Sequence, residues 1–347
     1  MAERDRIIDT VLALRELGLT PVEESPVAPE SLKVGRRKYR VTDARPSMGT
    51  RVTITTIAPS PGRAEEAVAR AFEEIKRLVA ILSRHDTSSP LSYLNQEGII
   101  EGCPPEMGHV VERALYFNRL SAGAFDITIK PLLDLFEERA GISGMVEPSD
   151  EELAQILKRT GVSALELEAD TLRFHKEGMG LTLDGIAKGF IVDMAAEVLK
   201  RHRIRDFLIN AGGDIRAGGN REDGKPWIIA VQDPARSGGY PEILSLTDGA
   251  VATSGNYEIH FDRELKYHHL IDSRSGRSPG LKSSVSVVAP TALAADALAT
   301  ALFITEEERG LAMMESLPRC GSLIISRCGA MLRSTRWPGQ RSDDTGG

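Results

Sequence analysis

Residues 294–303 (AADALATALF) constrain the fold of this chain more than any other segment, because they form a nearly all-apolar helix. A helix that is hydrophobic on every side has to be buried, so other elements must cover it all round. Its two oxygen-bearing side chains, Asp296 and Thr300, are four residues apart and therefore lie one above the other on the same face.

A carboxylate beside a hydroxyl offers two oxygen ligands to a hard cation. Mg²⁺ suits such a site, because it prefers oxygen, keeps several waters and takes its remaining ligands from substrate phosphates. The alternative is structural: an Asp near the start of a helix and a Thr that is hydrogen-bonded to its own backbone. The spacing alone favours this alternative, since short motifs often occur by chance.

Helices and strands are predicted in an irregular order. Helical periodicity covers 62–82 and about 106–121, Ser149 and Glu152 form a capping box that opens a further helix, and residues 181–200 fit a strand, a tight turn and a helix. Strands are predicted at 39–42, 48–56, 207–210, 227–231, 250–254, 258–261, 283–288, 321–325 and 330–333, with a hairpin at 165–174. We therefore expect an α+β fold with mixed, largely antiparallel sheets flanked by helices.

The length of 347 residues indicates one large domain or two closely joined lobes. We place an N-terminal helix and linker at residues 1–38, the folded domain at 39–335 and a flexible tail at 336–347. The linker prediction rests on the Pro, Glu and Ser content of residues 21–38.

Composition excludes several classes of protein. The net charge is −7, and no Lys/Arg stripe is interleaved with aromatic residues, so nucleic acid is not an expected partner. Cys103, Cys320 and Cys328 are odd in number and lack CxxC spacing, which argues against a disulfide framework or a zinc site and predicts buried free thiols. We find no apolar run long enough to span a membrane. Residues 1–20 lack the apolar core of a signal peptide, which predicts a cytoplasmic location for the chain as written.

Two glycine-containing stretches are candidate phosphate sites. Residues 210–219 could cradle an anion with backbone N–H groups, or could simply form tight turns between antiparallel strands. In residues 183–189, a turn that opens a helix places free amide groups and Lys188 where a pyrophosphate could dock, and a carbonyl of this turn could be a third ligand of Mg²⁺. The alternative is an ordinary helix start with Asp184 as its cap.

His268 and His269 are adjacent and shortly precede Asp272. On a strand, neighbouring side chains face opposite sides, so at most one of the two histidines points into a site. That histidine could serve as a general base near a phosphate-bound metal, or could pack against a ligand ring.

Several stretches, in one order along the chain, together resemble the FAD:protein FMN transferase (ApbE) family. The similarity extends from about residue 39 to residue 333. The matching stretches are 48–50 (MGT), 83–95 (SRHDTSSPLSYLN), 123–128 (GAFDIT), 183–189 (LDGIAKG) with Asp193, 210–214 (NAGGD), 254–257 (SGNY), 269–272 (HLID) with Gly276, and 296–303 (DALATALF).

The resemblance implies a two-lobed single domain and a Mg²⁺-dependent enzyme. Such an enzyme binds FAD, transfers its FMN half to a Ser or Thr hydroxyl of an acceptor flavoprotein, and releases AMP. By this resemblance Asp296, Thr300 and the Gly185 carbonyl bind the metal, and Asp296 and His269 are the catalytic residues, His269 by assisting proton removal. The expected FAD-binding residues are Met48, His85, Ala124, Phe125, Asp126, Asp184, Lys188 and Ile271.

The chain departs from the family pattern at some positions. The usual Asp-Leu-Gly-Gly before the helix is replaced by residues 182–185 (TLDG). Thr182 thus stands where an Asp is expected to contact the flavin, and Asp184 is the candidate that takes over this contact. His85 stands where an aromatic residue often stacks on the ring system, and an imidazole presents less area. The export or lipoprotein signal common among relatives is absent, so the alternative location is periplasmic or membrane-anchored if the true start lies upstream.

Two further functions remain as alternatives. In an FAD pyrophosphatase, water replaces the protein hydroxyl and the products are FMN and AMP. In a non-catalytic flavin carrier there is no turnover, and Asp296 and Thr300 argue against it, because a carrier needs no metal on the pyrophosphate. The sequence does not separate transferase from pyrophosphatase, since both use the same metal and leaving group.

Overall fold

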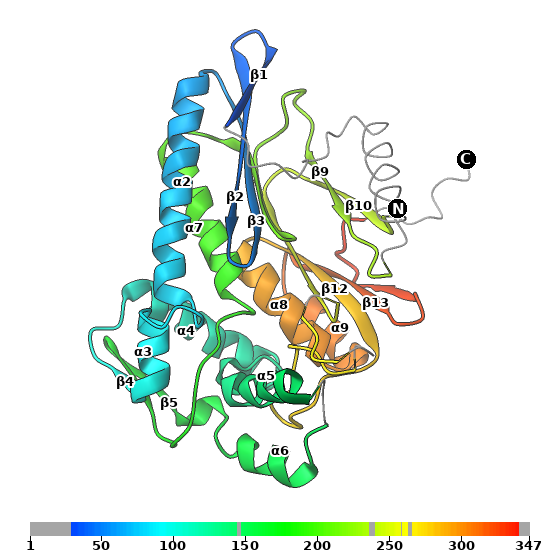
Figure 1. The fold of residues 1–347 in the computed structure, drawn as a ribbon. Helices are drawn as coiled ribbons and strands as arrows, with labels where there is room; N and C mark the ends of the chain where they lie inside the picture. The colour runs from blue at the N-terminus through cyan, green and yellow to red at the C-terminus, as the bar shows by residue number, and fades with distance from the viewer. Residues whose placement is uncertain (1–28, 144–146, 236–239, 258, 263–265, 340–347) are drawn as a thin grey trace.

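The computed structural model describes residues 29–143, 147–235, 240–257, 259–262 and 266–339. Within these ranges, nine strands form one sheet in the order β1-β2-β3-β7-β8-β11-β12-β13-β14, and all neighbouring pairs are antiparallel (Figure 1). Their bounds are β1 Glu30–Gly35, β2 Lys38–Ser47, β3 Thr50–Ala58, β7 Asp206–Ala211, β8 Asp214–Gly218, β11 Gly249–Gly255, β12 Lys282–Ala289, β13 Gly321–Ser326 and β14 Met331–Arg333.

Two smaller antiparallel sheets accompany the large one. One pairs β9 (Trp227–Val231) with β10 (Glu242–Leu246), and the other has the order β4-β6-β5 (Ile99–Ile100, Thr171–Phe174 and Leu165–Glu168). The helices are α2 Pro61–Leu82, α3 Pro90–Glu97, α4 Pro105–Leu120, α5 Lys130–Ser143, α6 Asp150–Leu157, α7 Ala187–Arg201, α8 Ala292–Ile304 and α9 Glu307–Glu315. The prediction of an α+β fold with largely antiparallel sheets is confirmed.

The large sheet has apolar side chains on both faces. Along β11, Ala250 and Ala252 belong to the main hydrophobic core, whereas Val251 between them packs in a second cluster with Ile229 of β9 and Trp337. This alternation is the period-two pattern of a strand that is buried on both sides. In Figure 1, α2, α7 and α8 lie together beside the sheet, and α8 contacts α7, β11 and β12.

Helix α8 is the buried helix that the sequence predicts. Only Ala294 and Thr300 of its thirteen residues are not fully buried. Thr291 begins the helix by accepting a hydrogen bond from the Ala294 N–H at 3.2 Å. The predicted helix at 62–82 is confirmed as α2, and the predicted capping box of Ser149 and Glu152 is present at the start of α6.

Several boundary predictions are wrong. Residues 30–35 of the predicted linker form β1, and Trp337 of the predicted tail is buried in the second cluster. Residues 181–183 pair with no strand, since the Thr182 N–H donates to the Ile127 carbonyl. Residues 259–261 of the predicted strand at 258–261 contain only an isolated bridge at His260. The predicted N-terminal helix and the end of the tail, residues 340–347, lie outside the described residues.

None of the helices in the described part of the chain is both long and apolar enough to cross a membrane. Cys103 and Cys320 are buried free thiols as predicted, whereas Cys328 is exposed.

Candidate functional site

Helices α7 and α8, which carry the predicted phosphate and metal groups, meet at their N-terminal ends. A Cβ atom on Gly189 would lie only 2.3 Å from the Ala292 carbonyl oxygen, and the Gly189 N–H donates to Asp296 Oδ2 at 3.0 Å. Asp193, one turn further along α7, accepts from the N–H groups of Ala292 and Leu293, both at 2.9 Å. A carboxylate at a helix N-terminus complements the helix dipole, so Asp193 fixes the start of α8.

The predicted metal ligands lie in one place. Asp296 is 4% exposed, and Thr300 follows it one turn later on the same face of α8. A Cβ atom on Gly185 would lie 3.0 Å from Thr300 Oγ1, so the turn before α7 packs directly against this hydroxyl. Ser254 of β11 approaches from the sheet, with its Oγ 3.3 Å from Thr300 Oγ1.

Two basic side chains next to this junction are paired with carboxylates. Lys188 Nζ lies 2.8 Å from Asp214 Oδ2. Arg84 donates through Nε to Asp184 Oδ2 at 2.7 Å and through Nη2 to Glu137 Oε1 at 2.8 Å. The Arg84 side chain is only 9% exposed, although both of its partners are more than 40% exposed.

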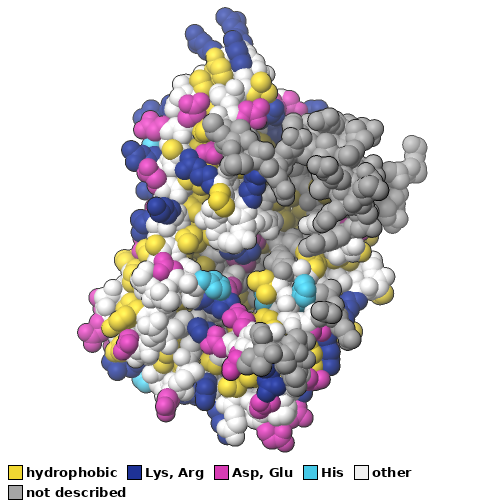
Figure 2. Space-filling view, viewed as in Figure 1, with side chains coloured by type: hydrophobic (Ala, Val, Ile, Leu, Met, Phe, Trp, Pro, Cys, Tyr) yellow, Lys and Arg dark blue, Asp and Glu magenta, His cyan; other side chains and the backbone are white. Residues whose placement is uncertain are grey.

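Asp184 is therefore not the cap of α7, because Ile186 occupies the N-cap position and no side chain caps this end. In Figure 2, histidine, basic and acidic side chains gather near the middle of the visible face. Three cations at the junction face five carboxylates, which leaves a formal charge of −2: Arg84, Lys188 and Arg216 against Glu137, Asp184, Asp193, Asp214 and Asp296.

His269 lies within the electrostatic reach of this cluster. Its ring Nδ1 is 3.0 Å from the Ile259 carbonyl oxygen. Burial lowers the pKa of the His269 imidazole below its ordinary value, and the positive charge of Lys188 also lowers it. The Asp184 carboxylate acts on this pKa in the opposite direction.

His268 points away into the core, as expected for a neighbour of His269. It is fully buried, its Nε2 lies 3.1 Å from the Pro279 carbonyl oxygen, and its ring packs edge-on against Phe303. Burial lowers the pKa of His268 to about 4. His268 is therefore a neutral core histidine at physiological pH.

The predicted FAD-binding residues before α5 differ in exposure. Ala124 and Phe125 are buried, and the Phe125 ring edge is 3.4 Å from the Cβ position of Gly185. Asp126 accepts from the backbone N–H of Thr128 at 2.8 Å and from its hydroxyl at 2.6 Å, while burial raises the pKa of the Asp126 carboxyl.

The other predicted FAD contacts lie on separate segments. Met48 lies in the β2–β3 turn with a φ of +53° rather than in a strand, and His85 is exposed in the loop before α3. The Ile271 side chain is 1% exposed in a cluster with Leu132 and Phe136, so a contact of Ile271 with FAD stays a prediction. Residues 210–214 form the turn of the β7–β8 hairpin, which is the structural alternative for this glycine stretch.

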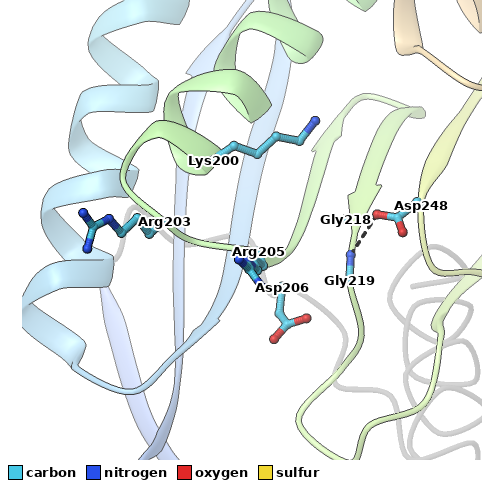
Figure 3. Close-up of a pocket in the computed structure, with 7 residues that line it drawn as sticks. All are labelled: Lys200, Arg203, Arg205, Asp206, Gly218, Gly219 and Asp248. Atoms are coloured by element: carbon cyan, nitrogen blue, oxygen red, sulfur yellow. Dashed lines mark hydrogen bonds between the residues drawn. The ribbon is translucent and has the colours of Figure 1, made fainter.

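A pocket of about 650 Å³ lies at the other end of α7 (Figure 3). Its lining includes Lys200, eleven residues after Gly189 and so roughly 16 Å further along the helix. Lys200 and Arg203 point in different directions in Figure 3, and the Gly219 N–H donates to Asp248 at 3.2 Å. Gly218 and Gly219, from the glycine stretch 210–219, line this pocket, but none of the expected metal-binding, FAD-binding or catalytic residues does.

The sequence reasoning assigned no role to Arg84, Asp193, Asp214 or Ser254. All four lie in or beside matched stretches of the family pattern, which is the signal that could have identified them. Their partners are 100, 99, 26 and 46 residues away in the chain, respectively, so only the folded structure pairs them.

Two solved structures that superpose on this chain carry the name flavin or flavinyl transferase. The flavin transferase ApbE from Vibrio cholerae superposes with a TM-score of 0.75 at 30% identity and covers 86% of this chain and 98% of that chain. The apo form of the flavinyl transferase ApbE from Pseudomonas stutzeri gives a TM-score of 0.77 at 26% identity, over 88% of this chain and 97% of that chain.

The chain belongs to the ApbE family, whose model matches residues 48–324. An FAD:protein FMN transferase of Vibrio cholerae is 35% identical over 282 residues, which are 78% of this chain and 83% of that protein. The FAD:protein FMN transferase of Haemophilus influenzae is 30% identical over 271 residues, which are 74% of this chain and 78% of that protein.

Proposed function

We propose that this chain transfers the FMN part of FAD to a Ser or Thr hydroxyl of an acceptor flavoprotein and releases AMP. The main support is the junction of α7 and α8, where Gly185 packs against Thr300 and the Gly189 N–H orients Asp296. Relatives that cover most of this chain carry the name FAD:protein FMN transferase.

The donor groups at this junction fit Mg²⁺. A carboxylate, a hydroxyl and a backbone carbonyl are all oxygen donors, with no thiolate or imidazole among them. Asp296, Thr300 and the Gly185 carbonyl would hold the ion, which when bound neutralises charge on the diphosphate and the leaving oxygen.

The charge balance supports the same proposal. Because the carboxylates at the junction outnumber the cations, the junction has a formal charge of −2. Without a divalent ion it would therefore repel the negative diphosphate of FAD. Lys188 and the amide groups of the first turn of α7 would bind a phosphate at the helix N-terminus. His269 would take the proton of the acceptor hydroxyl.

The decisive experiment replaces Asp296 by Asn and measures AMP release from FAD with a co-purified acceptor. We expect Asp296→Asn to lower turnover by roughly 10²-fold or more, with a much smaller effect on FAD binding, because the lost group acts mainly on transition-state charge. The control is Asp206→Asn in the pocket at the other end of α7, and this variant should keep its activity. Wild-type turnover in Asp296→Asn would refute the metal site.

The products separate the proposed transfer from its alternatives. Covalent flavin fluorescence on the acceptor in a denaturing gel, with one AMP per flavin attached, supports transfer. Free FMN and AMP with no labelled acceptor would support the pyrophosphatase, and bound FAD without AMP would support the carrier.

A further inference from the structure

His269 is carried by two short antiparallel segments, residues 259–262 and 266–269, here together called the histidine arm. The arm is closed by a bridge between His260 and His268 and by the Phe261 N–H, which donates to the Tyr267 carbonyl at 2.8 Å. The His269 N–H donates to the Ile259 carbonyl at 3.1 Å. The backbone of His269 and of the two residues before it is therefore held by residues 259–261.

Aromatic stacking attaches this arm to α5. The ring of Phe136 stacks on Phe261 at 5.6 Å between centroids and on Tyr267 at 5.7 Å, so it contacts one residue from each of the two segments of the arm. Phe136 is 1% exposed. Stacked aromatic pairs of this kind stabilise the contact beyond the apolar area that they bury.

The ring of His269 is held by the same carbonyl as its backbone. Nδ1 lies 3.0 Å from the Ile259 oxygen, and a carbonyl oxygen can only accept a hydrogen bond, so Nδ1 carries the hydrogen. In a neutral imidazole the other nitrogen, Nε2, then has the free lone pair. Burial opposes the doubly protonated, charged form.

We propose that the histidine arm, held by Phe136, keeps His269 in the Nδ1–H tautomer, so that Nε2 is the atom that removes the proton from the acceptor hydroxyl. The assignment of Nε2 as the base rests on the proposed transferase function, whereas the tautomer itself rests only on the geometry of the arm.

The step is balanced in atoms and electrons. The O–H bond of the acceptor Ser or Thr breaks and its proton moves to Nε2. The hydroxyl oxygen forms a bond to the phosphorus of the FMN half, while the bond from that phosphorus to the bridging oxygen breaks. Its electron pair leaves on the AMP phosphate. No oxidant or reductant is needed.

The neighbouring histidine provides an internal reference. His268 Nε2 faces the Pro279 carbonyl at 3.1 Å and therefore carries the hydrogen, whereas the buried His268 Nδ1 has no hydrogen-bond partner among the described residues. Adjacent histidines thus have opposite tautomers. Each can be identified in a spectrum that distinguishes protonated from unprotonated ring nitrogens.

The first test is a long-range ¹H–¹⁵N spectrum of the full chain labelled with ¹⁵N-histidine at neutral pH, without FAD. The signals lost in His269→Gln should be those of an Nδ1–H tautomer, and those lost in His268→Gln should be those of an Nε2–H tautomer. An Nε2–H, charged or rapidly averaging His269 would overturn the proposal. This readout does not depend on turnover, so it distinguishes a wrong tautomer from a wrong function.

The second test addresses the positioning role of Phe136. Phe136→Leu should lower the transfer rate roughly tenfold to 100-fold, the cost of a misplaced catalytic group. Phe72→Leu, the same replacement at another buried phenylalanine in α2, should leave the rate unchanged. In a His269→Gly background supplied with free imidazole, Phe136→Leu should have no further effect, because the base is no longer attached to the arm. If Phe136→Leu lowered the rate equally in the wild-type and the His269→Gly backgrounds, the substitution would be damaging the fold in general, and the positioning role would be overturned.

Discussion

At the scale of single residues, Asp184 illustrates how one pairing changes the chemistry of a neighbour. Its carboxylate bonds to Arg84 rather than to the start of α7, and it raises the pKa of His269 while burial lowers it. The balance leaves the pKa of His269 below its ordinary value of 6.5. A base that stays neutral under mildly acidic conditions can accept a proton there.

The transfer rate should therefore fall with decreasing pH only below about 6.5, as His269 becomes protonated. Asp184→Asn removes a negative charge that raises this pKa and that partly neutralises Arg84. The acidic limb of the pH–rate profile, where the rate falls with decreasing pH, should therefore move to lower pH. The measurement is kcat/KM against pH for both proteins.

The control is Asp134→Asn, since Asp134 is an exposed carboxylate of α5 that pairs with Lys130. It should leave the acidic limb in place. An acidic limb that moves to higher pH in Asp184→Asn would contradict the assignment of this limb to His269.

At the scale of elements, the close approach of α7 and α8 depends on one missing side chain. A methyl group on Gly189 would overlap the backbone of Ala292 and Leu293. Overpacking of this kind typically costs about 1–3 kcal/mol, so Gly189→Ala should destabilise the protein in urea unfolding and lower its activity. Gly108→Ala in α4 should be stabilising by about 0.5–1 kcal/mol, because nothing lies within 4 Å of its Cβ position.

Equal stabilities of the two alanine variants would show that the helices separate freely. In that case the hydrogen bond from Gly189 to Asp296 would not hold the junction together.

The C-terminal end of α8 is held by a buried lysine. Lys282 Nζ donates to the carbonyl groups of Leu302 at 2.9 Å, of Phe303 at 3.2 Å and of Thr305, and burial lowers the pKa of Lys282 to about 8. Between pH 8 and 10.5 the unfolded chain keeps a proton that the folded chain has released, so stability from this residue rises with pH.

We therefore compare the free energy of unfolding of the wild type with that of Lys282→Met at pH 7.5 and at pH 10. The difference should change by about 2 kcal/mol in favour of the wild type at the higher pH. A difference that does not depend on pH would mean that Lys282 keeps its ordinary pKa in the fold.

Local patterns predicted the elements whose signals are contained in their own residues. The apolar run correctly predicted that α8 is buried, and the capping box at Ser149 correctly predicted the start of α6. The strand predicted at residues 181–183 is wrong because Leu181 and Leu183 are buried without a strand beside them. An alternation of apolar residues does not distinguish this arrangement from a strand in a sheet. The pairing of Arg84 with Asp184 and the capping of α8 by Asp193 depend on tertiary contacts between residues about 100 apart.

At the scale of the whole molecule, the site lies on the helix that joins the parts of the fold. Because α8 packs against α7 and against β11 and β12 of the large sheet, opening the site requires breaking the main core. The two tryptophans, Trp227 and Trp337, lie in clusters on the other side of the sheet. Neither cluster contains any of the expected metal-binding, FAD-binding or catalytic residues, so the tryptophans report on a separate part of the fold.

Unfolding should consequently occur as one transition, with the same midpoint by tryptophan fluorescence and by far-UV circular dichroism. FAD with Mg²⁺ at 100 times its dissociation constant should stabilise the whole fold by about 2.7 kcal/mol and shift both midpoints together. In the Asp296→Asn variant, FAD alone should still raise the unfolding midpoints, but Mg²⁺ should add nothing to this stabilisation. If ligand moved only the circular dichroism midpoint, the tryptophan side of the sheet would unfold independently of the site.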